Sequence, residues 1–420
     1  MKHRHLICLV FAGLLSVPSS AQESVRSLAE VNGRLENHDG LRILRVWGTP
    51  DERGYAHGVL LGKEVVAMAR AEFAARFAKK PGRMGQIHKM LERMVRYPEN
   101  VEEEMRAMYR GVKETVDDLR LDEFDRDLMY EDLLVANALD IFAPIACSGM
   151  TVWGDKVVGG GVLTTRNFDW PYTGKHMVDD TLVLVEHPSE GAAFACVTWP
   201  GYLGGITAVN ERGLAVFLHV GSGRITIAPE PESYPTAIAA REILRTATVA
   251  DAREVGARLI AETSPPISYI SRIVLPRIPK GSSSPTIVFE ADARKEVVRE
   301  VEGYCVVTNH FLGRDDGRSI SRDSQSRFDK ITAGVEGNLS RGDRKISVAE
   351  AWESLSSVER GERRAFGTLH SLVFRGDPWV FELAIGTPAE GGMVRAATRS
   401  ERRYSVPKKV LFKSPTGEGQ

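Results

Sequence analysis

Three side chains that could act together in catalysis lie close to one another in the chain: Cys147, Arg166 and Asp169. The segment from Cys147 to Trp170 has the pattern of a strand, a Gly-rich turn and a second strand. Such a hairpin brings a thiol, a guanidinium and a carboxylate to one end of two paired strands. A nearby cation increases the ionised fraction of a thiol, and the thiolate is the nucleophile. The pattern predicts a nucleophilic cysteine, and its place far inside the chain indicates an enzyme that cleaves its own backbone to free it.

The segments around this hairpin must form the scaffold that positions it. Residues 22–146 have apolar residues at helical spacing and are predicted to be mostly helical. After Pro144 the pattern changes to β-like runs separated by Gly, Pro, Asn and Asp, with helices between two groups of strands. Helices are expected at His57–Lys79, Asn100–Leu119, Arg126–Ile141, Tyr234–Ala261 and Ser324–Val335, and after the capping box Ser347–Glu350. Hairpins, paired helices and hairpins again predict an α+β fold of two sheets between helical layers.

The expected strands follow from period-two patterns and turn residues. They are Met150–Lys156, Gly161–Phe168, Thr181–Glu186, Ala192–Trp199, Gly205–Val209, Leu214–Val220, Ile267–Leu275, Thr286–Phe289, Glu296–Val301, Tyr304–Asn309, Thr368–Phe374 and Trp379–Ala384. Asn210-Glu211-Arg212-Gly213 reads as the turn between two of them.

The charge balance excludes some partners. Lys and Arg number 55 and Asp and Glu number 56, which gives a formal net charge of −1. A nucleic acid or an anionic membrane usually requires a basic excess, so neither is expected as a partner. No segment is long and apolar enough to span a bilayer.

The N-terminal segment has the features of a secretory signal. It begins with a basic stretch, continues with an apolar core at Leu6–Val17, and ends in the small residues Ser19-Ser20-Ala21. We expect removal after about Ala21 and export to a periplasmic or extracellular location. Removal leaves three cysteines, Cys147, Cys196 and Cys305, so at least one thiol stays free of any intramolecular disulfide. Their spacing does not match a structural zinc site, and no metal or organic cofactor is expected.

Further motifs follow the hairpin in order: Asn210-Glu211-x-Gly213-Leu214, Thr308-Asn309-His310-Phe311 and Ser326-Arg327-Phe328. Upstream stand Gly48-Thr49-Pro50-Asp51-Glu52-Arg53-Gly54 and His57-Gly58. Together with Cys147 and Arg166-x-x-Asp169, they resemble the cysteine N-terminal-nucleophile (Ntn) hydrolases of the acyl-coenzyme A:6-aminopenicillanate acyltransferase group. More distantly, the chain resembles choloylglycine hydrolases and acid ceramidases. The resemblance covers roughly residues 40–385.

The resemblance implies a four-layer αββα sandwich and cleavage of the bond between Ala146 and Cys147. The domains would then be a signal peptide (1–21), a helical propeptide or small subunit (22–146) and the catalytic Ntn-hydrolase domain (147–420). The freed cysteine would combine nucleophile and base, because an α-amine titrates near ~8 and is partly neutral at working pH. The two cleavage fragments could remain together as a heterodimer.

The resemblance also implies a role for each site residue. Asp169 would orient the α-ammonium of Cys147, and Arg166 would stabilise the thiolate or the substrate carbonyl. Asn210, through its backbone N–H, and Asn309, through its side-chain amide, would form the oxyanion hole. Arg327 would be a second site arginine that stabilises the network, with Arg322 as the alternative for this assignment.

These roles predict an amidohydrolase or acyltransferase that cleaves a linear amide of a small N-acyl compound through a thioester. An ester or lipid hydrolase of the phospholipase B-like type is an alternative on the same fold. A papain-like enzyme would instead take its base from His187, His219, His310 or His370. A secreted binding protein without catalytic activity, with Cys147 as a buried core thiol, is the alternative from another class.

Overall fold

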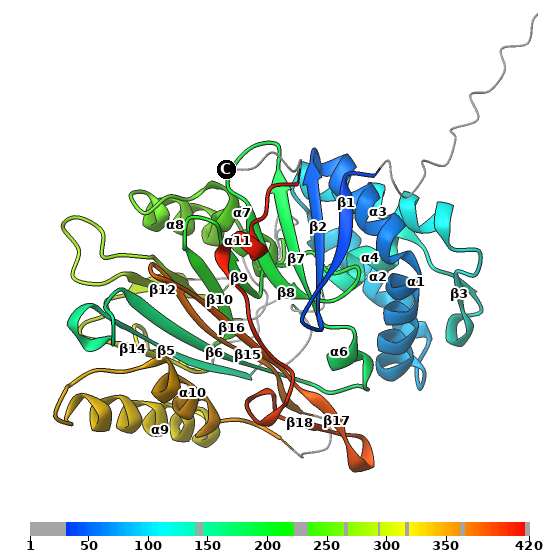
Figure 1. The fold of residues 1–420 in the computed structure, drawn as a ribbon. Coiled ribbons are helices and arrows are strands. Elements are labelled where there is room, and N and C mark those ends of the chain that lie inside the picture. The colour runs from blue at the N-terminus through cyan, green and yellow to red at the C-terminus, as the bar shows by residue number, and fades with distance from the viewer. Residues whose placement is uncertain are drawn as a thin grey trace, which may run out of the picture.

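The structure is a computed structural model and describes residues 31–138, 141, 146–221, 234–263, 268–292, 295–315, 319–361 and 366–415. In this part of the chain, two β-sheets stack face to face and helices cover their outer faces (Figure 1). The predicted α+β sandwich of αββα type is therefore confirmed. The predicted signal peptide lies outside the described residues.

The larger sheet contains nine described strands, and its only parallel pair is β2 with β7. Their order is β1 (Gly33–His38), β2 (Leu41–Gly48), β7 (Leu182–Pro188), β8 (Phe194–Thr198), β9 (Thr207–Asn210), β10 (Ala215–Val220), β11 (Tyr269–Val274), β12 (Thr286–Asp292) and β13 (Lys295–Arg299). Central strands such as β10 and β11 are buried along almost their whole length, because both faces of the sheet are covered.

The smaller sheet contains six antiparallel strands in the described residues. Their order is β14 (Cys305–Val307), β5 (Ala146–Trp153), β6 (Val162–Trp170), β15 (Gly367–Gly376), β16 (Trp379–Ile385) and β19 (Arg403–Ser405). The predicted β5–β6 hairpin is confirmed, and its turn contains Gly159, Gly160 and Gly161 with φ of 78°, 75° and 80°. Glycine adopts these positive φ values without the penalty that a Cβ imposes.

Polar contacts join the facing sides of the two sheets. Arg272 on β11 donates a hydrogen bond to the Thr165 carbonyl on β6 (2.5 Å), and His370 on β15 contacts the Thr207 hydroxyl on β9 (2.9 Å). Cys147 therefore lies on a strand whose inner face is closed off by a second sheet.

Helices form the two outer layers (Figure 1). The larger sheet is covered by α1 (Pro50–Phe77), α3 (Glu99–Thr115), α7 (Thr236–Thr246) and α8 (Ala252–Thr263), with α2 (Gly82–Met94) and α4 (Tyr130–Asn137) beside them. The smaller sheet is covered by α9 (Arg322–Leu339) and α10 (Val348–Ser356), which enclose a second apolar core around Met150, Ile331 and Trp352. Short elements complete the fold: β3 (Arg120–Leu121), β4 (Arg126–Asp127), α6 (His176–Asp179), β17 (Thr387–Ala389), β18 (Met393–Arg395) and α11 (Lys408–Leu411).

Three expectations for the helices need correction. The N-terminal region is not only helical, because the β1–β2 hairpin joins the larger sheet. The helix expected at Arg126–Ile141 is shortened to Tyr130–Asn137, since Arg126–Asp127 pairs with Arg120–Leu121. The helix expected at Tyr234–Ala261 is divided into α7 and α8, and Thr248 contacts Asp251 at the break.

The motif Gly48–Gly58, which covers the start of α1, packs α1 closely against α3. Thr49 and Glu52 form a capping box at the start of α1. Gly54 and Gly58 face the backbone of α3, so closely that a Cβ would overlap the carbonyl oxygens of Glu104 and Met108. The motif glycines are thus explained by helix packing.

Gly58→Ala is expected to lower the free energy of unfolding by about 2–3 kcal/mol, because the two helices must move apart. Gly85→Ala on the exposed face of α2 is the matched control, since a Cβ there meets no atom within 4 Å. It should raise stability by about 0.5–1 kcal/mol through helix propensity. Chemical denaturation of both variants measures the difference, and equal effects would contradict the packing argument.

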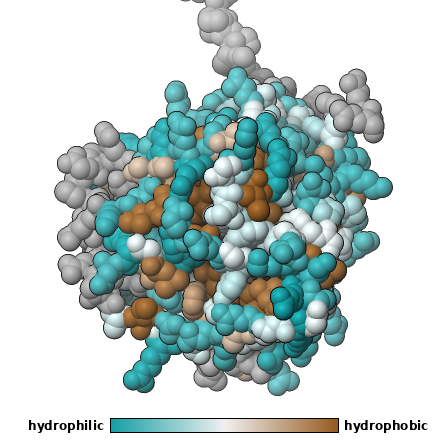
Figure 2. Space-filling view, turned by 90° about the vertical axis from the view of Figure 1, so that its left-hand side faces the viewer, coloured by the Kyte–Doolittle hydropathy of each residue, from teal (hydrophilic) through white to brown (hydrophobic). Residues whose placement is uncertain are grey.

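Two features of the described residues concern contact with a membrane: the apolar character of the helices and the exposed apolar side chains. Among the described helices, none combines the length and apolar character needed to cross a bilayer. The large apolar side chains that are exposed in the described residues are dispersed over the chain: Leu35, Val158, Ile278, Leu312 and Ile320. In the view of Figure 2, apolar atoms are separated by hydrophilic ones.

Candidate active site

Cys147 lies near the start of β5, opposite Phe168 on β6, and its side chain is fully buried between the sheets. Arg166, two residues before Phe168, points to the same face and donates a hydrogen bond from Nη2 to the Cys147 sulfur (3.1 Å). The predicted contact between thiol and guanidinium is therefore present.

Arg166 occupies apolar surroundings. Its guanidinium lies over the rings of Phe168 (5.4 Å) and Phe217 (5.9 Å), and Nε and Nη1 have no hydrogen-bond partner among the described residues. Burial lowers its pKa, but an arginine stays charged near neutral pH. The site thus keeps a poorly compensated positive charge beside the sulfur.

The Cys147 thiol is neutral near pH 7 in this structure. Burial raises the pKa of Cys147 to about 11, although the positive charge of Arg166 opposes this. At pH 7 only about one thiol in 10⁴ would be ionised. An additional positive charge next to the sulfur would increase that fraction.

The backbone of Cys147 is held on its other edge by two side chains. Strand β14 pairs with β5 only over Gly149–Thr151, so residue 147 has no strand partner on that edge. Asn309 Oδ1 accepts the Cys147 N–H (2.9 Å), and Arg327 Nη1 donates to the Cys147 carbonyl (2.6 Å). Arg327 also donates to Asn309 Oδ1 (2.7 Å). Arg322 is exposed, so the geometry favours Arg327 as the second site arginine.

Asp169 lies on the opposite face of β6 from Arg166, as expected for residues three apart in a strand. Its Oδ1 accepts a hydrogen bond from Thr368 (2.6 Å), and its Oδ2 lies 3.4 Å from Arg360 Nε without a hydrogen bond in the described residues. Burial raises its pKa. In the strand register Asp169 is directly opposite Ala146.

Asn210 is the one predicted site residue that the structure does not bring to the cluster. Its N–H donates to the Leu214 carbonyl (2.8 Å), and its side chain bonds Leu214 and the end of α7. His219 of β10 is the residue of this hairpin that approaches the Cys147 carbonyl, and five residues of extended chain separate it from Leu214, about 16 Å at roughly 3.3 Å per residue. Because Asn210 closes the far end of the β9–β10 hairpin, the geometry does not support it as an oxyanion-hole donor.

Several residues join the site that the sequence did not assign to it. Ser324 accepts the Asn309 N–H (2.8 Å), Thr368 and Arg360 hold Asp169, and His219 on β10 approaches the Cys147 carbonyl. Ser324 stands three residues before Arg327, a helical spacing that could have identified it. His219 was named only as one of four histidines.

An apolar pocket that opens to solvent lies near this cluster, and the centre of a water-sized molecule can occupy about 50 Å³ of it. Its wall includes Val65 and Phe73 of α1, Leu133 of α4, and Trp170, Trp199 and Tyr202. Phe168, the residue opposite Cys147, stacks on Trp170 (5.5 Å) and lies 5.9 Å from Trp199. One aromatic ring therefore separates the pocket wall from the cysteine.

A protein-family model named "acyl-coenzyme A:6-aminopenicillanic acid acyl-transferase" matches residues 158–390, more than half of the chain. The chain belongs to this family. The membership confirms the predicted resemblance and agrees with an enzyme of the amidohydrolase or acyltransferase type. Arg166, Asp169, Asn309 and Arg327 all fall in the part matched to the acyltransferase family, whereas Cys147 lies just before it.

Two curated proteins also resemble this member of the acyltransferase family. An uncharacterized protein from Archaeoglobus fulgidus is 28% identical over 197 residues, which are 42% of this chain and 32% of that protein. Protein dcd1B of Dictyostelium discoideum is 24% identical over 212 residues, 46% of this chain and 42% of that protein. The chain thus spans about a third of the length of the Archaeoglobus protein and about two fifths of the length of dcd1B.

Solved structures with low similarity were found as well. The N-acylethanolamine-hydrolyzing acid amidase ortholog of Caenorhabditis elegans is 14% identical, with a TM-score of 0.40 over 62% of this chain and 100% of that one. A mutant of the conjugated bile acid hydrolase from Clostridium perfringens is 12% identical, with a TM-score of 0.38 over 62% and 96%. Penicillin V acylase from Agrobacterium tumefaciens is 13% identical, with a TM-score of 0.37 over 57% and 83%.

Proposed function

We propose that this protein is a cysteine Ntn hydrolase or acyltransferase that cleaves a linear amide bond through a thioester on Cys147. The observation that carries the proposal is the environment of Cys147. Arg166 contacts its sulfur, while Asn309 and Arg327 fix its N–H and carbonyl. Cys305, another buried thiol, also accepts a hydrogen bond from an arginine, so it is the combination with Asn309 and Arg327 that argues against a binding protein that holds Cys147 only as packing.

The first step would be cleavage of the chain before Cys147. The sulfur attacks the Ala146 carbonyl carbon, the peptide C–N bond breaks, and the resulting thioester is hydrolysed by water. The new α-amine takes up the proton and becomes the base for later turnover. As an ammonium it adds positive charge beside the sulfur, which favours the thiolate. Asp169 is opposite Ala146, and its Oδ2 accepts no hydrogen bond among the described residues although Arg360 Nε lies 3.4 Å away, which supports a role in orienting this amine.

Turnover would repeat the same chemistry on an external amide. The thiolate adds to the acyl carbon, the C–S bond forms, and the carbonyl π pair moves to oxygen. The carbonyl then re-forms as the C–N bond breaks, and the leaving amine takes a proton from the α-ammonium. Water or a second amine attacks the thioester and restores the thiol.

We propose the apolar pocket as the place for the acyl group. Its wall is aromatic and aliphatic, and it begins one ring away from Cys147. The charged residue on its wall, Glu72, is paired with Arg76 (2.7 Å) and His176 (2.7 Å). The pocket therefore favours an uncharged, apolar acyl chain or aromatic ring.

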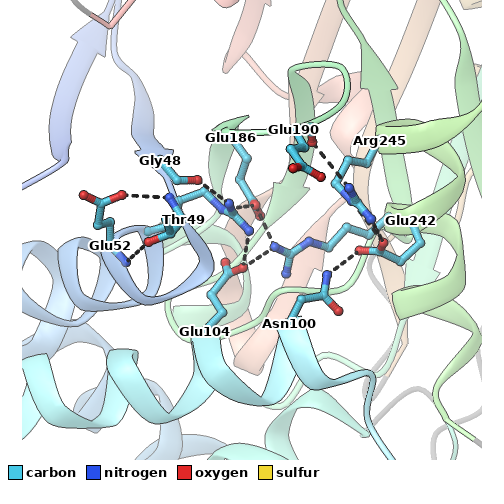
Figure 3. A network of polar contacts seen from close by, with 11 residues as sticks. Gly48, Thr49, Glu52, Asn100, Glu104, Glu186, Glu190, Glu242 and Arg245 are labelled. Atoms are coloured by element: carbon cyan, nitrogen blue, oxygen red, sulfur yellow. Dashed lines mark hydrogen bonds and ion pairs between the residues drawn. The ribbon is translucent and has the colours of Figure 1, made fainter.

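We propose that region 22–146 remains bound after cleavage as the small subunit of a heterodimer. Strand β2 pairs with β7 over six residues. In addition, Arg53 and Glu104 of this region form a buried cluster with Glu186 and Arg241 of the catalytic domain (Figure 3). Burial opposes ionisation of Glu104, but Arg241 and Arg53 hold its pKa below the usual value.

Glu104→Ala is expected to destabilise the protein by about 3–5 kcal/mol and to release the small fragment from cleaved material. The reason is that the buried arginines Arg53 and Arg241 would then share one carboxylate, that of Glu186. Glu102→Ala removes an exposed pair with Arg106 and is the control, with an expected loss below about 1 kcal/mol. Denaturation and size-exclusion chromatography measure both effects. A loss below 1 kcal/mol for Glu104→Ala would contradict the account of the fragment interface.

The substrate class is tested with matched pairs of N-acyl amides and esters of the same acyl group. We expect amine release from the amides, with rates that increase from acetyl to phenylacetyl or octanoyl. A protein that hydrolyses only the esters would instead be a lipase of the phospholipase B-like type. Trapping with hydroxylamine should convert the acyl-enzyme to a hydroxamate, which reports the thioester directly.

Export of the mature protein after removal of residues 1–21 is part of the proposal. It is tested by fractionating expressing cells and sequencing the exported chain. Recovery only inside the cell, with residues 1–21 attached, would overturn it.

A further inference from the structure

His219 lies on β10 and points into the space between the two sheets. The guanidinium groups of Arg166 and Arg272 lie 5.9 Å and 5.0 Å from the ring of Phe217, on the inner face of the larger sheet. His219 stands two residues after Phe217 in β10 and therefore points to the same inner face. The side chain is fully buried, and the ring approaches the carbonyl of Cys147. His219 thus adjoins the nucleophile from the opposite sheet.

The ring nitrogens of His219 are unusual among the buried histidines. Neither Nδ1 nor Nε2 of His219 has a hydrogen-bond partner in the described residues. In contrast, His57 accepts from the Gly201 N–H (3.0 Å), His310 contacts Ser324 (2.8 Å) and His370 contacts Thr207 (2.9 Å). A buried polar group without a partner is unfavourable and requires an explanation, such as a partner supplied by the reaction.

The charges around His219 determine its protonation state. Burial and the positive charges of Arg166, Arg272 and Arg327 hold its pKa well below the usual value. The imidazole is therefore neutral at working pH, with one N–H donor and one acceptor nitrogen. It is too weak a base to compete with an α-amine for the thiol proton.

Most other hydrogen-bond donors near Cys147 are already engaged; the exceptions are Nε and Nη1 of Arg166, whose guanidinium lies over the rings of Phe168 and Phe217. Asn309 Nδ2 donates to the Val220 carbonyl (2.8 Å), and Arg166 Nη2 is bound to the sulfur. Arg327 is bound to the Cys147 carbonyl and to Asn309, while Asn210 lies at the far end of β10. Next to the nucleophile, the buried ring of His219 approaches the Cys147 carbonyl but forms no hydrogen bond of normal geometry in the described part of the chain. Its N–H is therefore only weakly held where it stands.

We propose that His219 is a catalytic residue whose ring N–H donates a hydrogen bond to the oxygen of the acyl carbonyl while Cys147 adds to it. This proposal rests on the proposed function of Cys147. As the C–S bond forms, the carbonyl π pair becomes an oxyanion, and His219 stabilises that charge without losing its proton. When the C–N bond breaks, the carbonyl re-forms and the hydrogen bond weakens. Such a bond is strongest in the transition state and therefore acts on kcat.

The test compares His219→Gln, which keeps an N–H donor, with His219→Leu and His219→Met, which do not. The full chain is expressed, and kcat, KM, thermal stability and the extent of self-cleavage are measured with an N-acyl p-nitroanilide. The apolar variants should lose about 10²–10³-fold in kcat with KM within about threefold, and Gln should recover at least tenfold of that loss. His187→Leu, a histidine outside the cluster, is the control and should keep wild-type kcat.

Three outcomes would overturn the proposal for His219. They are wild-type kcat in either apolar variant, equal losses in the Gln and apolar variants at equal thermal stability, and a loss that appears only in KM. If both apolar variants fail to fold, the infrared carbonyl band of the acyl-enzyme decides. It should shift to higher wavenumber in the smaller variant His219→Ala, which has no side-chain donor, and stay close to the wild type in His219→Gln. An unchanged band in His219→Ala would overturn the proposal. If the wild type itself releases no amine, the proposed function fails instead.

Discussion

Cys147→Ala is expected to remove self-cleavage and amide turnover together. In the proposed mechanism, the sulfur attacks in both reactions and the α-amine of Cys147 is the base in the second. Alanine has no sulfur to attack, so neither self-cleavage nor turnover should occur. The loss should reach roughly 10⁴–10⁶-fold, as for other nucleophiles that act as one unit with their base. Cleavage is read by intact mass, and turnover by amine release.

The matched control for this prediction is Cys305→Ala. Cys305 is also buried in the smaller sheet, and it also accepts a hydrogen bond from an arginine, Arg299 (3.3 Å). Its replacement should lower stability modestly and leave cleavage and turnover intact. Cys147→Ser keeps a weaker nucleophile and should allow partial cleavage with much slower turnover. Wild-type turnover in Cys147→Ala would exclude the mechanism.

Arg166→Met is expected to reduce turnover by about 10²–10³-fold while the free energy of unfolding stays constant or rises by about 1–4 kcal/mol. Activity falls because burial then raises the pKa of the Cys147 thiol without opposition from this guanidinium. Stability does not fall, because the guanidinium is fully buried with Nε and Nη1 unbonded in the described residues. Opposite effects on activity and stability are typical of a residue kept for function.

Arg272→Met separates this role from a general effect of buried charge. Arg272 is fully buried on the same inner face and lies over Phe217 (5.0 Å), but its hydrogen bond goes to the Thr165 carbonyl. Turnover should remain close to wild type. Steady-state kinetics and chemical denaturation of both variants provide the comparison. A destabilised Arg166→Met protein with unchanged turnover would show that Arg166 is structural.

The sequence predicted the part of the site that depends on one hairpin. Cys147, Arg166 and Asp169 follow from a strand, turn and strand with fixed alternation, so their relative placement is local. The sequence also indicates that Arg166 and Asp169 point to opposite faces of β6, because residues three apart in a strand lie on opposite sides. The placement of Arg327 over the cysteine backbone depends on how α9 packs, and the sequence left it open between Arg327 and Arg322.

The geometry does not support the prediction for Asn210, because a turn motif identifies local geometry and not proximity to a distant residue. Asn210 uses its side chain to close the β9–β10 turn, which is the role its turn sequence indicates. The position of His219, at the other end of β10, depends on how the two sheets stack, and the sequence does not report this stacking. Its unpaired nitrogens are a property of packing, which no spacing in the chain reports.

The structure of the N-terminal region was also only partly predictable from the sequence. Its helices follow from apolar spacing, but the partner of β2 is β7, about 140 residues later. The apolar and β-branched residues of Leu41–Trp47 could have predicted a strand, whereas its parallel pairing could not be derived. The division into residues 22–146 and 147–420 stays a proposal that depends on cleavage.

The most direct test of the central claim is the N-terminal sequence and intact mass of the purified, active protein. The account predicts two co-purifying chains, one beginning at Cys147 and one ending at Ala146, with turnover that increases in proportion to the cleaved fraction. Fully active material in which the bond between Ala146 and Cys147 remains intact would contradict it.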